Sequence, residues 1–103
     1  MKTTYEHFEE EFLKYNIEAW LLFENVVISL VDCPKKGWEA SAVYIRDARL
    51  TNDAFDAFIN RITGNDLLFE HVYPSRKELL NDFRYKGMSL KEMWKEIELL
   101  NEF

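Results

Sequence analysis

Residues 17–44 read IEAWLLFENVVISLVDCPKKGWEASAVY, and this stretch decides the fold class. Two apolar runs rich in β-branched and aromatic residues flank the dipeptide Glu24-Asn25, and such runs are typical of strands. The segment 33–37 then places two lysines between Pro34 and Gly37, which indicates a turn. Alternation resumes at Trp38. The stretch therefore predicts three consecutive strands of a mostly antiparallel sheet.

One alternative stays open inside this stretch. Glu24-Asn25 is a poorer hairpin signal than Asn-Gly, because the tightest hairpin turns favour residues that tolerate a positive φ. The segment Ile17–Phe23 is therefore either the first strand or an extension of a preceding helix.

The segment before it has the spacing of an amphipathic helix from about residue 4 to residue 15. Thr3 and Glu6 stand three residues apart, as in a capping box, where each side chain hydrogen-bonds the backbone N–H of the other. Acidic residues in the first turn also favour the positive end of the helix dipole. The side chains predicted to face the core are Tyr5, Phe8, Phe12 and Tyr15.

Beyond residue 44 the pattern changes from strand to helix and back. Thr51 and Asn52 are good N-caps for a helix whose apolar stripe stops at Gly64. Alternating residues from Asp66 to Tyr73 then predict a fourth strand, which Pro74 ends.

Two more capping boxes close the chain, Ser75 with Glu78 and Ser89 with Glu92. They predict two helices, the second of which runs to Leu100. The element order becomes α-β-β-β-α-β-α-α, an α+β fold with a mostly antiparallel sheet of three to four strands packed with helices. The length of 103 residues and the 16% aromatic content suit a single globular domain spanning residues 1–103, in which the three tryptophans fill the core.

The acidic charge is concentrated near the N-terminus. Residues 1–33 hold seven acidic residues against two lysines, so they carry −5 of the net charge of −6. Such a field attracts basic protein surfaces and repels nucleic acid, so we expect no direct nucleic-acid binding. No apolar run is long enough to span a bilayer, and the single Cys33 fits a reducing compartment. We expect a cytoplasmic protein without a membrane partner.

Signatures of catalysis are sparse. The three glycines are too far apart for a phosphate-binding loop, and Cys33, His7 and His71 lack the spacing of metal ligands. We therefore expect no cofactor and no metal. Cys33 at a strand end is predicted to be a small buried residue, and His71 a partly buried strand residue with a hydrogen-bond partner. A small enzyme that uses Cys33 and His71 as nucleophile and base remains a hypothesis.

The leading hypothesis is a non-enzymatic binding protein that blocks a basic surface of a nucleic-acid-acting enzyme. In size, acidity and lack of catalytic motifs the chain resembles phage-encoded anti-defence inhibitors, of the anti-CRISPR or anti-restriction type, and bacterial immunity proteins. That likeness is one of composition. The alternative is a self-associating structural or regulatory module that forms a homodimer through a sheet edge or an aromatic surface. The residues predicted to contact the partner enzyme are Glu6, Glu9, Glu10 and Glu11.

Overall fold

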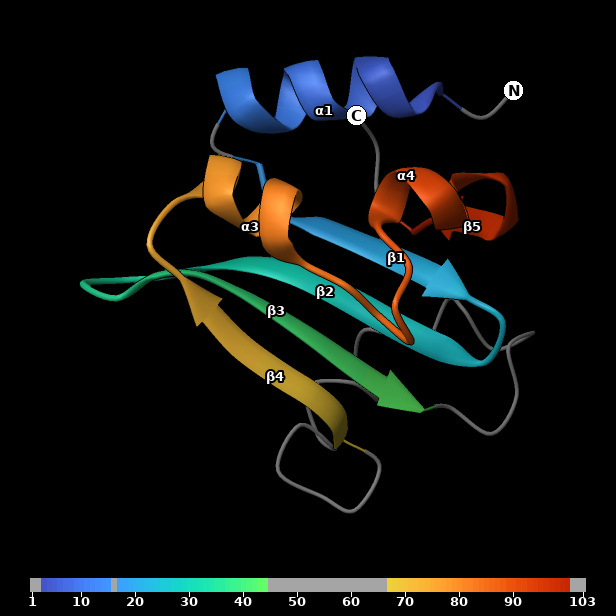
Figure 1. Cartoon of the computed structure of the whole chain (residues 1–103). Helices are drawn as coiled ribbons and strands as arrows, with labels where there is room; N and C mark the ends of the chain where they lie inside the picture. The colour runs from blue at the N-terminus through green and yellow to red at the C-terminus, as the bar shows by residue number, and fades with distance from the viewer. Residues whose placement is uncertain (1–2, 16, 45–66, 101–103) are drawn as a thin grey trace.

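The computed structural model describes residues 3–15, 17–44 and 67–100, which form one sheet with helices on one of its faces (Figure 1). The sheet has five strands in the order β4-β3-β2-β1-β5, and every neighbouring pair is antiparallel. The predicted α+β class is confirmed. In chain order the elements are α1 (Tyr5–Lys14), β1 (Ala19–Phe23), β2 (Val26–Cys33), β3 (Gly37–Tyr44), β4 (Leu67–Tyr73), α3 (Arg76–Asp82), α4 (Leu90–Met93), the 3₁₀ turn η2 (Trp94–Glu96) and β5 (Ile97–Leu99).

The β1–β2 hairpin settles the open question about Ile17–Phe23. α1 ends at Lys14, and the chain is extended before it enters β1. Glu24-Asn25 forms a two-residue turn that pairs Phe23 with Val26. Glu24 has a φ of 55°, the left-handed conformation that two-residue hairpin turns require at their first position. The segment is therefore a strand, because Glu24 adopts the conformation that glycine usually supplies.

The central strands are buried on both faces, so the sheet separates two apolar clusters. On the face opposite the helices, the buried Ser29 and Ser41 place their hydroxyl oxygens 2.7 Å apart and satisfy each other. The tryptophans divide accordingly: Trp38 and Trp94 lie in the main core, as predicted, whereas Trp20 is half-buried against the second cluster. The helix-side core includes Phe8, Phe12, Leu21, Ile28, Leu30, Leu79 and Phe83, and the second cluster contains Leu22, Val27 and Val43.

The start of α1 differs from the prediction by one residue. The cap is Thr4, whose hydroxyl oxygen accepts a hydrogen bond of 3.2 Å from the backbone N–H of His7, so the predicted capping box of Thr3 with Glu6 is wrong. The Thr3 carbonyl instead accepts a hydrogen bond of 3.0 Å from the Trp94 indole. A contact from the far end of the chain thus holds the residue just before the helix cap.

The aromatic stripe of α1 behaves as its spacing predicts. Tyr5, Phe8 and Phe12 are buried, and the rings of Phe8 and Phe12 stack with centroids 5.6 Å apart. Tyr15 is 46% exposed because it lies beyond the last helical residue, so its predicted place in the core is wrong.

The C-terminal third contains both predicted helix starts. The Ser75 hydroxyl accepts from the backbone N–H of Glu78, and Ser89 with Glu92 forms a complete capping box. The second helix is much shorter than predicted, since α4 ends at Met93 and residues 97–99 form β5. This fifth strand exceeds the expected three to four. It forms because pairing with β1 hydrogen-bonds an otherwise exposed strand edge, a contact that helical periodicity does not reveal.

Of the two elements predicted between residues 51 and 73, one lies within the described residues. The predicted strand at residues 66–73 is β4, which pairs antiparallel with β3. The helix predicted between Thr51 and Gly64 lies outside the described residues. In the described ranges, no helix has the length and apolarity needed to cross a bilayer.

Candidate functional site

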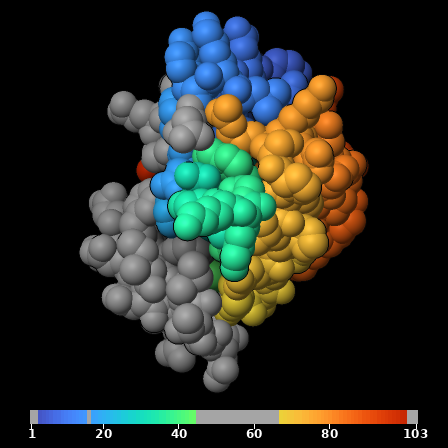
Figure 2. Space-filling view, turned by 90° about the vertical axis from the view of Figure 1, so that its left-hand side faces the viewer, coloured from blue at the N-terminus to red at the C-terminus, as the bar shows by residue number. Residues whose placement is uncertain are grey.

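The acidic face of α1, defined here as Glu6, Glu9, Glu10 and Glu11, covers the part of the helix that the core leaves free. Glu6 and Glu10 are exposed, whereas Glu9 and Glu11 are half-buried at the flanks of the helix. Figure 2 shows α1 (blue) along one end of the molecule, with its outer surface open to solvent. Burial of the aromatic stripe therefore presents the carboxylates outward.

The four glutamates do not form a single set. Helical geometry places Glu6, Glu9 and Glu10 on one flank, at spacings of three and four residues, and Glu11 on the other flank. Glu11 lies 3.9 Å from the imidazole of His7. The structure thus brings three of the four predicted residues together and separates the fourth.

Glu9 also has a role inside the fold. Burial, followed by the negative charge of Glu9 and its hydrogen bond with the Tyr5 hydroxyl, raises the pKa of Tyr5 to about 12. The Glu9 carboxylate therefore already interacts with the Tyr5 hydroxyl and is less available to a partner. Glu6 and Glu10 remain the carboxylates most accessible to a partner.

Arg76 holds the C-terminal end of α1. Its guanidinium donates hydrogen bonds of 2.9 Å and 2.6 Å to the backbone carbonyls of Phe12 and Tyr15. The same guanidinium lies over the Trp38 ring, 5.7 Å from the centroid. Because the last carbonyls of a helix lack partners within the helix, a cation placed there satisfies both their hydrogen-bonding capacity and the helix dipole. α1 is thereby anchored at this end by Arg76 and at the other by Trp94.

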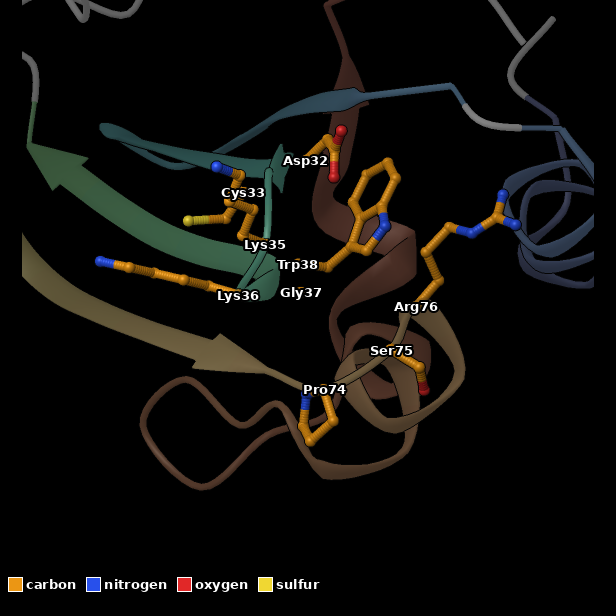
Figure 3. Close-up of a pocket in the computed structure, with 9 residues that line it drawn as sticks. All are labelled: Asp32, Cys33, Lys35, Lys36, Gly37, Trp38, Pro74, Ser75 and Arg76. Carbon is orange, nitrogen blue, oxygen red and sulfur yellow. The ribbon is translucent and has the colours of Figure 1, made fainter.

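Beside this anchor lies an open cleft of about 520 Å³, between the β2–β3 turn and the start of α3. In Figure 3 the Arg76 side chain extends toward α1 and Lys36 extends to the opposite side, with Trp38 between them. The cations of the cleft therefore diverge. They do not converge on one ligand atom, and Arg76 already serves the helix end.

A second hollow of about 450 Å³ runs along β4. It is lined by alternate residues of the strand, Phe69, His71 and Tyr73, and by Asp82 at the end of α3 and Arg84 just after it. The pKa of Tyr73 is raised by burial and by the nearby Asp82 carboxylate, while Arg84 opposes this shift. The hollow thus combines aromatic side chains with one acid and one cation.

The predicted pair of Cys33 and His71 does not come together. His71 pairs with Ala40, whose side chain faces the helix-side core, whereas Cys33 belongs to the alternate set of β2 that faces the other side. Cys33 is half-buried and His71 is exposed, so the predictions of a buried cysteine and a partly buried histidine are both wrong. Strand alternation thus places the two side chains on opposite faces of the sheet.

No group of three or more potential metal ligands gathers in the part of the chain that the structure describes. Sequence reasoning missed the roles of Arg76 and Trp94, because their carbonyl acceptors lie more than sixty residues away along the chain. Comparison with protein-family models, with curated proteins and with solved structures finds no match for this chain.

Proposed function

We propose that the chain is a non-enzymatic binding protein that inhibits a nucleic-acid-acting enzyme by covering its basic surface with the acidic face of α1. The observation that supports this proposal is the division of α1 into a buried aromatic side and a carboxylate side. Phe8 and Phe12 are fully buried, while Glu6 and Glu10 face solvent. The carboxylates thus stand on a helix whose position the core already fixes.

A fixed helix is a favourable carrier for such contacts. Ordering a flexible segment on binding costs free energy, and a helix anchored by Arg76 and Trp94 avoids most of that cost. Complementary charge then increases the association rate and selects against acidic partners. We assign the main contacts to Glu6 and Glu10, with Glu9 on the same flank of the helix and Glu11 on the other. Phage anti-defence and immunity proteins are the classes that this mode of action fits.

The test is affinity capture from a nuclease-treated lysate of the source cell or of its host, with elution in a salt gradient and identification by mass spectrometry. The proposal expects one basic nucleic-acid enzyme to elute at moderate salt, because screening weakens contacts between exposed charges. Adding the purified chain should then inhibit that enzyme in an activity assay. Capture of a partner whose activity is unchanged by the chain would contradict inhibition.

A second candidate function is self-association, and it is favoured by β4, which pairs with β3 alone among the described residues. The third hypothesis, an enzyme that uses Cys33 and His71, gains no support from side chains on opposite faces of the sheet. Replacing Cys33 with serine is therefore not expected to change the inhibition.

A further inference from the structure

The two edges of the sheet differ in length. β5 has three residues and ends one edge, whereas β4 has seven residues and ends the other. Among the described residues β4 pairs with β3 alone. Natural proteins protect exposed edges with short strands, charged side chains, proline, bulges or a covering helix or loop. β4 has a bulge near Leu67 and is followed by Pro74, but the run Phe69–Tyr73 between them is regular, contains no proline, and carries Glu70 as its one acidic side chain.

The register shows which backbone groups of β4 point outward. A two-residue turn makes Phe23 and Val26 a hydrogen-bonded pair, and hydrogen-bonded pairs then alternate along and across an antiparallel sheet. The alternation directs the backbone of Trp20 away from β2, and its carbonyl indeed accepts a bond of 2.8 Å from Leu100 on the other side. The pattern of hydrogen-bonded pairs inferred from the turn therefore agrees with the hydrogen bond that Trp20 makes on the side of β1 facing away from β2.

Carried across to β3, the same alternation directs the backbone groups of Trp38, Ala40 and Ala42 toward β4. Their partners in β4 are Phe69, His71 and Tyr73, which therefore use their N–H and C=O groups inside the sheet. The close approach of the Tyr73 carbonyl oxygen to Gly37 agrees with this direction. Glu70 and Val72, between these residues, direct their N–H and C=O groups outward.

We propose that two copies of this chain pair antiparallel through β4, with His71 on the two-fold axis. In this register Glu70 of each copy lies opposite Val72 of the other, so the outward backbone groups of both residues find partners across the axis. The side chains of paired residues share a face of the sheet. The helices of both copies therefore lie on the same side of one continuous sheet.

Neighbouring registers are less favourable. Centring the axis on Glu70 places two carboxylates directly opposite each other, and like charges in that position destabilise a pair of strands. Centring it on Val72 places Glu70 opposite Pro74, which has no N–H to donate. With His71 on the axis, Phe69 of each copy faces Tyr73 of the other copy. Aromatic pairs across strands are stabilising.

The side chains around β4 fit this arrangement. Leu68 is 52% exposed and lies at the end of the paired run, where a second copy would cover it. The hollow of about 450 Å³ lined by Phe69, His71 and Tyr73 lies on the face where the rings of the second copy arrive. Figure 2 shows the atoms of β4 (yellow) at the surface beside α3 (orange). This inference is independent of the proposed function, because the acidic face of α1 has no part in it.

A cysteine scan tests the register. In a Cys33→Ser background, His71→Cys places two thiols across a non-hydrogen-bonded pair, where the Cα atoms lie about 4.5 Å apart and a disulfide forms readily. We expect H71C to form a disulfide-linked dimer under mild oxidation at micromolar concentration. Glu70→Cys should crosslink at least tenfold less, as should Glu98→Cys on β5. Equal crosslinking of all three variants would overturn the proposal, and selective crosslinking of E70C would overturn this register.

Association without crosslinking is tested by sedimentation of the full chain. The wild-type chain should change from monomer to dimer as its concentration rises. Val72→Pro should remain a monomer while keeping the wild-type circular dichroism, because the N–H that it removes points away from β3. A wild-type chain that stays monomeric at ~100 µM, where weak but specific interfaces are populated, would contradict the proposal. So would a V72P variant that dimerises like the wild type.

Discussion

At the scale of single residues, Gly37 has a conformation that few other residues tolerate. It joins the β2–β3 turn to β3 with a φ of 129°, and a Cβ atom at this position would overlap the Tyr73 carbonyl oxygen. Gly87 also has a positive φ, 79°, but a Cβ atom there would meet no other atom within 4 Å. A side chain at Gly87 would therefore meet backbone strain alone, whereas one at Gly37 would meet backbone strain and a steric overlap.

This difference predicts the effect of two alanine substitutions. Gly87→Ala should lower the free energy of unfolding by about 1 kcal/mol, the cost of a positive φ for an L-residue. Gly37→Ala adds the clash with Tyr73 and should cost about 3 kcal/mol. Urea denaturation followed by fluorescence measures both values. Equal losses would show that β4 moves freely away from Gly37.

Tyr5 predicts how stability depends on alkaline pH. The folded state raises its pKa to about 12 from the ordinary value of 10.0, so the neutral phenol is favoured by folding. The stability linked to this group is complete below pH 10 and is lost as the pH rises toward 12. Tyr5→Phe should therefore lose less stability than the wild type between pH 10 and 12, as measured by urea denaturation at several pH values. Tyr15→Phe, at an exposed position, is the control and should follow the wild type; a Y5F curve parallel to the wild-type curve would contradict this role for Tyr5.

At the scale of elements, local signals predict where helices begin better than where they end. The serine caps at Ser75 and Ser89 are found where the sequence places them, because a cap depends on residues three positions apart. The prediction that the last helix runs to Leu100 is wrong, because residues 97–99 pair with β1, which lies more than seventy positions earlier in the chain. The acidic residues of the candidate site could be predicted, but the commitment of Glu9 to Tyr5 depends on how deeply the core buries that ring.

The attachment of α1 is the long-range feature that sequence analysis could not reveal. Arg76→Lys keeps the charge but shortens the side chain and removes the planar guanidinium, which lies over Trp38 and whose one terminal nitrogen donates to the carbonyls of both Phe12 and Tyr15. We expect R76K to lower the free energy of unfolding by about 2 kcal/mol, the range for hydrogen bonds made by charged groups. Lys77→Ala on the exposed side of α3 is the matched control and should change it by less than about 0.5 kcal/mol. A denaturation midpoint of R76K equal to that of the wild type would show that Arg76 does not anchor the helix.

At the scale of the whole molecule, the two proposed surfaces are formed by different elements. The acidic face lies on α1, and the proposed dimer edge is β4, at the opposite end of the sheet from the short strand β5. Pairing through β4 would place two acidic helices on the same side of one sheet. A dimer would then bind a partner with two equivalent basic surfaces more tightly than a monomer, through a higher effective concentration.

The central claim is that the exposed carboxylates of α1 bind a basic partner, and one comparison tests it most directly. Three baits are compared in the affinity capture. They are the wild-type chain, an α1 variant with Glu6→Lys and Glu10→Lys, and a control variant with the same change in charge, Glu96→Lys and Glu98→Lys. All four positions are exposed, so each variant should retain the wild-type circular dichroism, although Glu6→Lys replaces the favourable acid in the first turn of α1 and should lower the unfolding midpoint slightly. The measurement is the salt concentration at which the captured enzyme elutes. We predict that the enzyme is lost, or elutes at much lower salt, only from the α1 variant; elution from all three baits at the same salt concentration would contradict the claim.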